Sequence, residues 1–164
     1  MENVELSTLA ELSLTLIGFS AIIAIVQGGP ISQWPPRIRN ALWLVVTTAI
    51  AALALCFVPM ALRGFGIPVH PLATVVLLVC VFLGFGASVK RSRELSSAGH
   101  TPPSTASWVL AGSISLSNAI CQTLSLLGVG NPEAFYNLGV AFIVIAAMIP
   151  LMVIISMGKA GNDV

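Results

Sequence analysis

Five long apolar stretches, separated by short polar segments, make up most of this chain. They cover residues 6–26, 38–62, 71–89, 106–128 and 136–157. A helix needs about 20 apolar residues to cross the roughly 30 Å hydrocarbon layer of a bilayer, because each residue adds about 1.5 Å of length. The pattern therefore predicts an all-α protein, with residues 1–164 forming a single domain of five transmembrane helices.

The first stretch differs from the others because it contains a charge, Glu11. An alternative is therefore four spans plus a first helix that is re-entrant or lies in the membrane interface. Glu2 and Glu5 precede this stretch, and no Lys or Arg does. A cleaved signal peptide begins with a basic region. We therefore expect the first stretch to belong to the mature protein.

The connecting segments are rich in helix-breaking residues. The third is the longest, from Lys90 to Thr105, and its serines and Pro102–Pro103 predict a flexible loop. The fourth, from Gly128 to Phe135, contains Asn131–Pro132 and predicts a tight turn.

Composition supports a membrane protein and excludes several other classes. Hydrophobic residues make up 57% of the chain and charged residues only 8%, whereas soluble domains carry about 25% charged residues. The net charge of +1 gives no basic face for a nucleic acid. The lipid bilayer is therefore the partner that the composition itself predicts.

The basic residues are distributed unevenly between the two sides that five spans define. Arg63 falls on one side, and the other six of the seven basic residues fall on the other side. Those six are Arg37, Arg39, Lys90, Arg91, Arg93 and Lys159. Because cytoplasmic loops retain Lys and Arg, we expect an inner-membrane protein with its amino terminus outside and its carboxyl terminus in the cytoplasm. The four-span alternative would move only the amino terminus. The basic loop residues serve as topology anchors in this interpretation, and they also suit anionic lipid head groups.

Polar and small residues recur at helical spacing in two of the stretches. The first set lies in residues 6–26 and the second in residues 106–128, each with steps of three or four residues. The first set is Ser7, Glu11, Thr15 and Gly18; the second is Ala111, Ser115, Asn118, Gln122 and Ser125.

The depths of these two sets match across an antiparallel pair of helices. Glu11 lies about 8 Å from the outer end of its span and Gln122 about 9 Å from the outer end of its own. Thr15 then pairs with Asn118, and Gly18 with Ser115. We therefore predict that the first and fourth spans are in contact, so that their polar groups satisfy each other.

Two interpretations of this polar set remain open. Ser, Thr, Asn and Gln side chains commonly hold membrane helices together, at about 0.6 kcal/mol per contact. In the second interpretation, Glu11 is a functional carboxylate, because an ionisable group within a span is expensive to keep there. It could then carry a proton or bind a cation, unless it reaches water by extending to the surface.

Residues for catalysis or metal binding are scarce. The two histidines, His70 and His100, fall on opposite sides of the predicted membrane, so they cannot share a metal. The sole aspartate is Asp163 at the tail, which excludes a Ser-His-Asp triad. We predict no metal site, no cofactor and no enzymatic activity.

The first sixty residues contain several short motifs: Ala10-Glu11-Leu12, Gly18-Phe19-Ser20, Trp34 with Arg37-x-Arg39 in the first loop, and a span that ends in Pro59. In these motifs the chain resembles a group of small bacterial multi-pass membrane proteins. This chain has Ala21 where the group usually has Gly. The group has no assigned activity, so the resemblance implies only that Glu11 and Gly18 recur together.

Two functions therefore compete. The first is an accessory or structural membrane subunit that acts through helix packing with itself, as a homo-oligomer, or with a membrane partner protein. The alternative is a small oligomeric transporter or channel, coupled to protons or cations, that uses Glu11 with Asn118 and Gln122.

Overall fold

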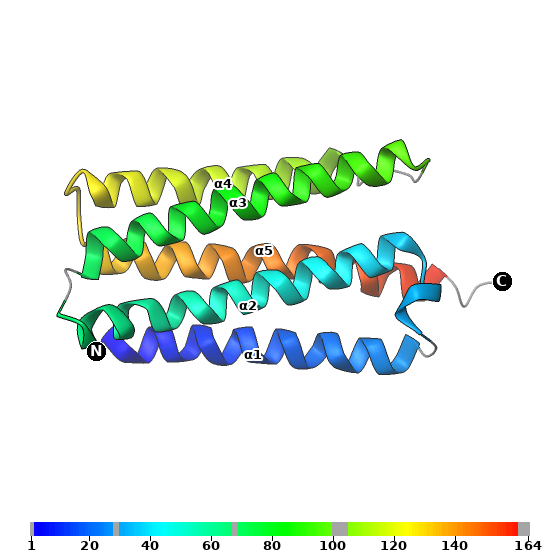
Figure 1. Ribbon diagram of the computed structural model, residues 1–164, viewed down its shortest axis with the longest axis horizontal. Helices are drawn as coiled ribbons and strands as arrows, with labels where there is room; N and C mark the ends of the chain where they lie inside the picture. The colour runs from blue at the N-terminus through cyan, green and yellow to red at the C-terminus, as the bar shows by residue number, and fades with distance from the viewer. Residues whose placement is uncertain (1, 28–29, 67–68, 100–104, 161–164) are drawn as a thin grey trace.

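The computed structural model describes residues 2–27, 30–66, 69–99 and 105–160, and over these residues the chain forms five α-helices. The helices are α1 (Glu2–Gln27), α2 (Pro36–Gly64), α3 (Val69–Ser97), α4 (Thr105–Leu126) and α5 (Pro132–Ala160), with a short 3-10 helix, η1 (Ile31–Gln33), before α2. Each α-helix is long and apolar enough to cross a membrane. The predicted all-α bundle of five spans is therefore confirmed. Helix α1 runs along most of the bundle beside α2 (Figure 1), as a full span would.

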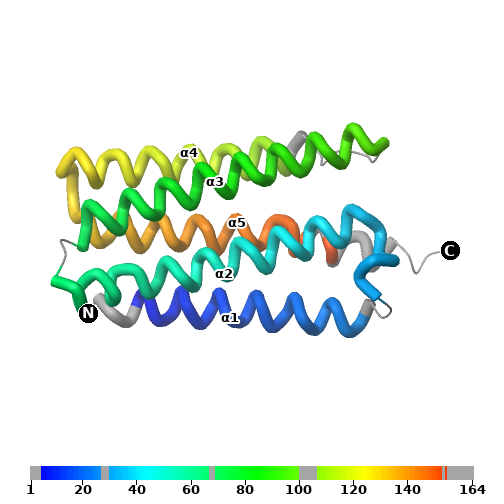
Figure 2. Tube along the Cα trace, in the orientation of Figure 1, coloured from blue at the N-terminus to red at the C-terminus, as the bar shows by residue number. Residues whose placement is uncertain are grey.

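Successive helices run in opposite directions, and the pair α2 and α5 forms the centre of the bundle. Helices α2 and α5 lie in the middle, α1 packs on one side of them, and α3 and α4 lie on the other side (Figures 1 and 2). A core of buried apolar side chains joins α1, α2, α3 and α5, with Leu16, Leu55, Leu77 and Val140 at its centre.

Helix α3 is longer than the sequence pattern predicts. The expected loop from Lys90 is wrong for residues 90–97, which continue the helix to Ser97. Five of these residues, Lys90, Arg91, Arg93, Glu94 and Leu95, are good helix formers, and Lys90 Nζ lies 4.0 Å from Glu94 Oε1 one turn away. The chain leaves the helix at Gly99, whose φ of 79° suits glycine. Residues 100–104 of the expected flexible loop, which include His100 and Pro102–Pro103, lie outside the described residues.

Helix α5 begins four residues before the predicted start at residue 136, because Pro132 and its neighbours form a well-capped first turn. Asn131 Oδ1 accepts a hydrogen bond of 2.9 Å from the Glu133 backbone N–H. Proline suits the first helical position, where its missing N–H costs nothing. The turn between α4 and α5 is consequently short.

The antiparallel arrangement separates the charges into two ends. We call the end with the starts of α2 and α4 the basic end, because Arg37, Arg39, Lys90, Arg91 and Arg93 lie there. At the opposite end, Glu133 Oε1 lies 3.7 Å from Arg63 Nη2 and 3.2 Å from His70 Nε2. The predicted grouping of these five basic residues at one end is thus present.

Candidate functional site

Helix α1 does not bury its predicted polar set in the bundle. Its buried side chains are Ser13, Leu16 and Ser20, which are at most 5% exposed and face α2 and α5. Ser7, Glu11, Thr15 and Gly18 are all exposed: Thr15 and Gly18 face outward, whereas Ser7 and Glu11 border a hollow between α1, α2, α3 and α5. We call these four residues the α1 outer face.

The polar set of α4, in contrast, faces inward and binds α5. Asn118 and Gln122 are 1% and 0% exposed. Asn118 Nδ2 donates to the Gly139 carbonyl at 3.0 Å, and Gln122 Nε2 donates to the Phe135 carbonyl at 2.7 Å. Two side-chain amides one turn apart thus hold α4 against the backbone of α5.

The predicted contact between the first and fourth spans is wrong. Among the described residues, α1 packs on α2 and α5, and α4 packs on α3 and α5, so that α2 and α5 separate the two helices (Figure 1). Thr15 donates to its own helix, at the Glu11 carbonyl 2.8 Å away. Glu11, Thr15 and Gly18 are therefore not brought to Asn118, Gln122 and Ser115, which lie on the other side of α5.

Gly139 is the important residue that the sequence reasoning missed. A Cβ atom at this position would overlap Gln122 Nε2 and would lie 3.0 Å from Asn118 Oδ1. The absence of a side chain is what lets both amides reach the α5 backbone. The sequence does contain a signal for it. Gly139 lies within an apolar span, and the span before it, across a short connecting loop, carries an Asn and a Gln four residues apart.

The two amide groups are only partly satisfied. Asn118 Oδ1 and Gln122 Oε1 are buried and accept no hydrogen bond in the described structure, and the same is true of Asn40 Oδ1 in α2. Buried acceptors without a donor are uncommon in proteins, because burial removes the water that would otherwise donate a hydrogen bond and the loss of that bond costs free energy.

A half-open crevice of about 390 Å³ lies between α2, α3, α4 and α5, on the side of the basic end. Its lining includes Arg37, Trp43, Gly84, Phe85, Trp108 and Ser115, and Asn118 closes its deep end. Trp43 and Phe85 are 39% and 36% exposed. We call this cavity the basic-end crevice.

A second hollow, of about 420 Å³, lies at the opposite end between α1, α2, α3 and α5. Arg63, His70, Glu133 and Tyr136 line it, and Glu11 stands at its α1 side. Tyr136 donates from Oη to the Leu55 carbonyl at 2.7 Å. Within the described part of the chain, no three His, Cys, Asp or Glu side chains are grouped to hold a metal ion.

Five apolar helices of this length define a polytopic membrane protein. No family model, curated protein sequence or solved structure matches this chain.

Proposed function

We propose that this protein is an accessory membrane subunit that packs its α1 outer face against a helix of a partner membrane protein. The observation that carries the proposal is the direction of this face. Polar and ionisable residues within membrane spans almost always face the bundle interior or a water-filled cavity. Here Thr15 and Gly18 are exposed on the outside of the bundle and Glu11 is exposed where it borders the second hollow, which is the arrangement expected of a helix whose neighbour belongs to another chain.

Depth makes lipid a poor environment for this face. Helix α1 has 26 residues, or about 39 Å of length, against roughly 30 Å of hydrocarbon. If the helix is centred in the bilayer, Glu11 lies about 9 Å below the hydrocarbon surface. A carboxyl group there is stabilised by any covering helix that supplies a hydrogen-bond donor.

The chemistry of the face specifies the partner. Glu11 offers carboxylate oxygens, and the Thr15 hydroxyl hydrogen is already used within α1, so both residues mainly accept hydrogen bonds. A Cβ at Gly18 would meet nothing within 4 Å, so another helix has room to approach closely there. The partner helix is therefore expected to carry a donor such as Lys, Arg, Asn or Ser opposite Glu11.

A second copy of this chain fits the face less well. Two copies in one membrane have the same orientation, so a symmetric α1–α1 pair places two Glu11 carboxyls at the same depth. Like charges in such a pair repel unless a proton is shared. A homo-oligomer through this face is thus the outcome that the proposal disfavours.

The transport alternative loses the geometry that motivated it. It needs Glu11 on one path with Asn118 and Gln122, but these amides bind α5, and Glu11 borders the second hollow rather than the crevice that Asn118 lines. The proposed subunit acts by binding alone, so it has no reaction of its own and requires no cofactor.

Site-specific photo-crosslinking in the cells that make the protein tests the proposal. A crosslinking amino acid at Thr15 should capture one defined protein, and the same probe at Leu83, which faces outward from α3 and is 68% exposed, should not. Glu11→Leu should lower the yield of this adduct at least about tenfold, because a hydrogen bond to a charged group is worth about 1.5–3 kcal/mol.

Glycine variants provide the matched control. Gly18→Leu should abolish the Thr15 adduct, whereas Gly86→Leu on α3 should leave it intact, since both glycines are exposed and neither has an atom within 4 Å of its would-be Cβ. An adduct between two copies of this chain, equal capture at Thr15 and Leu83, or insensitivity to Glu11→Leu would each contradict the proposal.

A further inference from the structure

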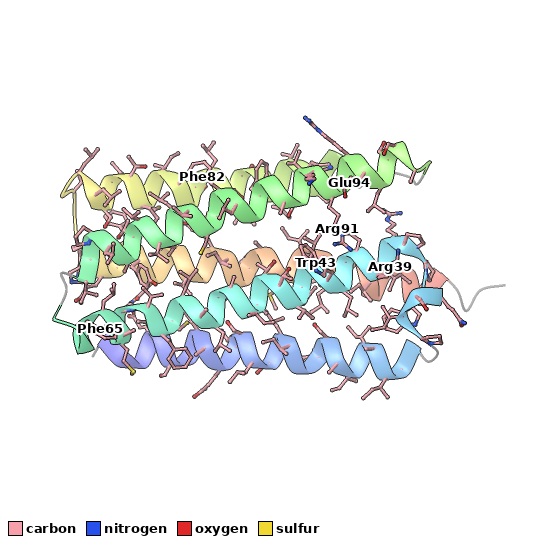
Figure 3. The ribbon with its side chains drawn as sticks, viewed as in Figure 1. Arg39, Trp43, Phe65, Phe82, Arg91 and Glu94 are labelled. Atoms are coloured by element: carbon pink, nitrogen blue, oxygen red, sulfur yellow. The ribbon has the colours of Figure 1, made fainter. Side chains whose placement is uncertain are left out.

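The basic-end crevice has one arginine in its lining and a second over one of its lining residues, and its interior is mainly apolar. Arg37 lines the crevice, and Arg91 lies over the lining residue Trp43, with its Cζ 4.5 Å from the ring centroid. Figure 3 shows Arg91 reaching from α3 toward Trp43 on α2. Within the described part of the chain, neither Arg37 nor Arg91 has a carboxylate at ion-pair distance.

The deeper lining is mainly apolar. The hydroxyls of Thr47 and Ser88 donate to their own helices, at the Trp43 and Gly84 carbonyls 2.7 and 2.8 Å away. At the far end, the Asn118 amide N–H is used by Gly139, and Asn118 Oδ1 is buried without a donor. An anionic group is therefore attracted to the mouth and excluded from the interior.

The length of the crevice suits a hydrocarbon chain. Its lining on α2 extends from Arg37 to Ala51, a distance of about 21 Å at 1.5 Å per residue. The acyl chains of one leaflet fill about half of the roughly 30 Å hydrocarbon layer, or about 15 Å. The volume of about 390 Å³ lies at the small end of the range of about 300–1,000 Å³ for ligand pockets, so it suits one chain rather than two.

From these observations we propose that the basic-end crevice binds an anionic phospholipid of the leaflet that faces the basic end. The phosphate lies between Arg37 and Arg91, where planar guanidinium groups bind its oxygens in pairs. One acyl chain enters the crevice past Trp43, Phe85 and Trp108, and the second chain stays in the bilayer, to which the half-open crevice gives access. The accessory role proposed above concerns α1, so this site is independent of it.

Quenching of tryptophan fluorescence by brominated lipid tests this site directly, because Trp43 and Trp108 both line the crevice. The protein is placed in phosphatidylcholine nanodiscs that contain a few mole per cent of phosphatidylglycerol with brominated acyl chains. Phosphatidylcholine with the same brominated chains serves as the uncharged comparison. We expect markedly stronger quenching by the phosphatidylglycerol at equal mole fraction.

Paired charge variants separate a built site from a diffuse basic surface. Arg37→Gln with Arg91→Gln should abolish the preference for phosphatidylglycerol over phosphatidylcholine, since each arginine–phosphate contact is worth about tenfold or more in affinity. Arg39→Gln with Arg93→Gln removes the same charge elsewhere at the basic end and should cost at most about fivefold per residue.

A pair of neutral variants gives an answer that does not depend on charge. Gly84→Leu fills the crevice, and Gly86→Leu places the same side chain on the other face of α3, outside the lining. Gly84→Leu should lose the stronger quenching by phosphatidylglycerol, and Gly86→Leu should retain it. Both variants should have the same helix content by circular dichroism. Equal quenching by both lipids, equal loss in both charge variants, or full binding by Gly84→Leu would overturn the proposal.

Discussion

Substituting Gly139 by alanine should destabilise the bundle by roughly 2–4 kcal/mol, the largest effect that we expect from adding a single methyl group. The new Cβ would overlap Gln122 Nε2 and crowd Asn118 Oδ1. The Gln122 amide must then move away from the α5 backbone, which breaks its hydrogen bond to the Phe135 carbonyl, and Asn118 must shift by a few tenths of an ångström beside its bond to the Gly139 carbonyl. Groups left unpaired inside the bundle have no water to replace the lost partners.

The free energy of unfolding in mixed micelles, measured by titration with sodium dodecyl sulfate, gives this effect directly. Gly112→Ala on α4 is the matched control, because a Cβ there meets nothing within 4 Å. Alanine in a helix interior is favoured over glycine by about 0.5–1 kcal/mol, so the control should be neutral or slightly more stable. Equal stability of both variants would show that Asn118 and Gln122 do not bind α5 as described.

The second large effect is expected at Leu77, which is fully buried where α3 meets the central helices. Leu77→Ala should cost roughly 1–3 kcal/mol. The value is smaller than for a soluble core, because lipid is as apolar as the bundle interior and transfer from water no longer contributes. What remains is the cost of the cavity and of the lost packing contacts.

Leu83→Ala on the same helix is its control. Leu83 is 68% exposed, and lipid chains can fill the space that its side chain leaves. Its effect on the same unfolding titration should therefore be within about 0.5 kcal/mol of zero. A larger loss of stability for Leu83→Ala than for Leu77→Ala would mean that α3 presents the other face to the bundle.

The number and type of the helices follow from the sequence because membrane solvation imposes them. A backbone in hydrocarbon must satisfy its hydrogen bonds within the segment, so a long apolar stretch becomes a helix. Local chemistry accounts for the boundaries that differ. Pro132 starts α5 early because Asn131 caps it, and α3 continues to Ser97 because charge on a good helix former does not end a helix.

The neighbours of each helix were not predictable from depth alone. Glu11 and Gln122 match in depth, but matching depth permits any helix at that level as a partner. The short turn between α4 and α5 makes α5 the nearest neighbour of Gln122, and Gly139 opens its backbone to the amide. A backbone carbonyl as acceptor leaves little trace in a sequence, because every residue has one.

The outward direction of Thr15 and Gly18 was missed for a related reason. A polar set at helical spacing shows which residues share a face, but not whether this face meets the bundle, lipid or another protein. The serines that do face the bundle, Ser13 and Ser20, donate to the carbonyls of Leu9 and Leu16 within α1. A serine whose hydroxyl bonds to its own helix packs like a small apolar residue. The side of α1 that faces the bundle was therefore not the side with the more polar sequence pattern.

The membrane crossing itself is tested most directly by the sidedness of single cysteines in a variant that lacks Cys56, Cys80 and Cys121. Each cysteine is introduced in turn at Asn3, Ser32, Phe65, Ser97, Val129 or Ala160, which lie near the helix ends, and intact cells are treated with a membrane-impermeant maleimide. We expect labelling from outside at Asn3, Phe65 and Val129, and labelling at Ser32, Ser97 and Ala160 only after the membrane is opened. Labelling of any two successive positions from the same side, or of all six positions alike, would contradict a chain that crosses the bilayer five times.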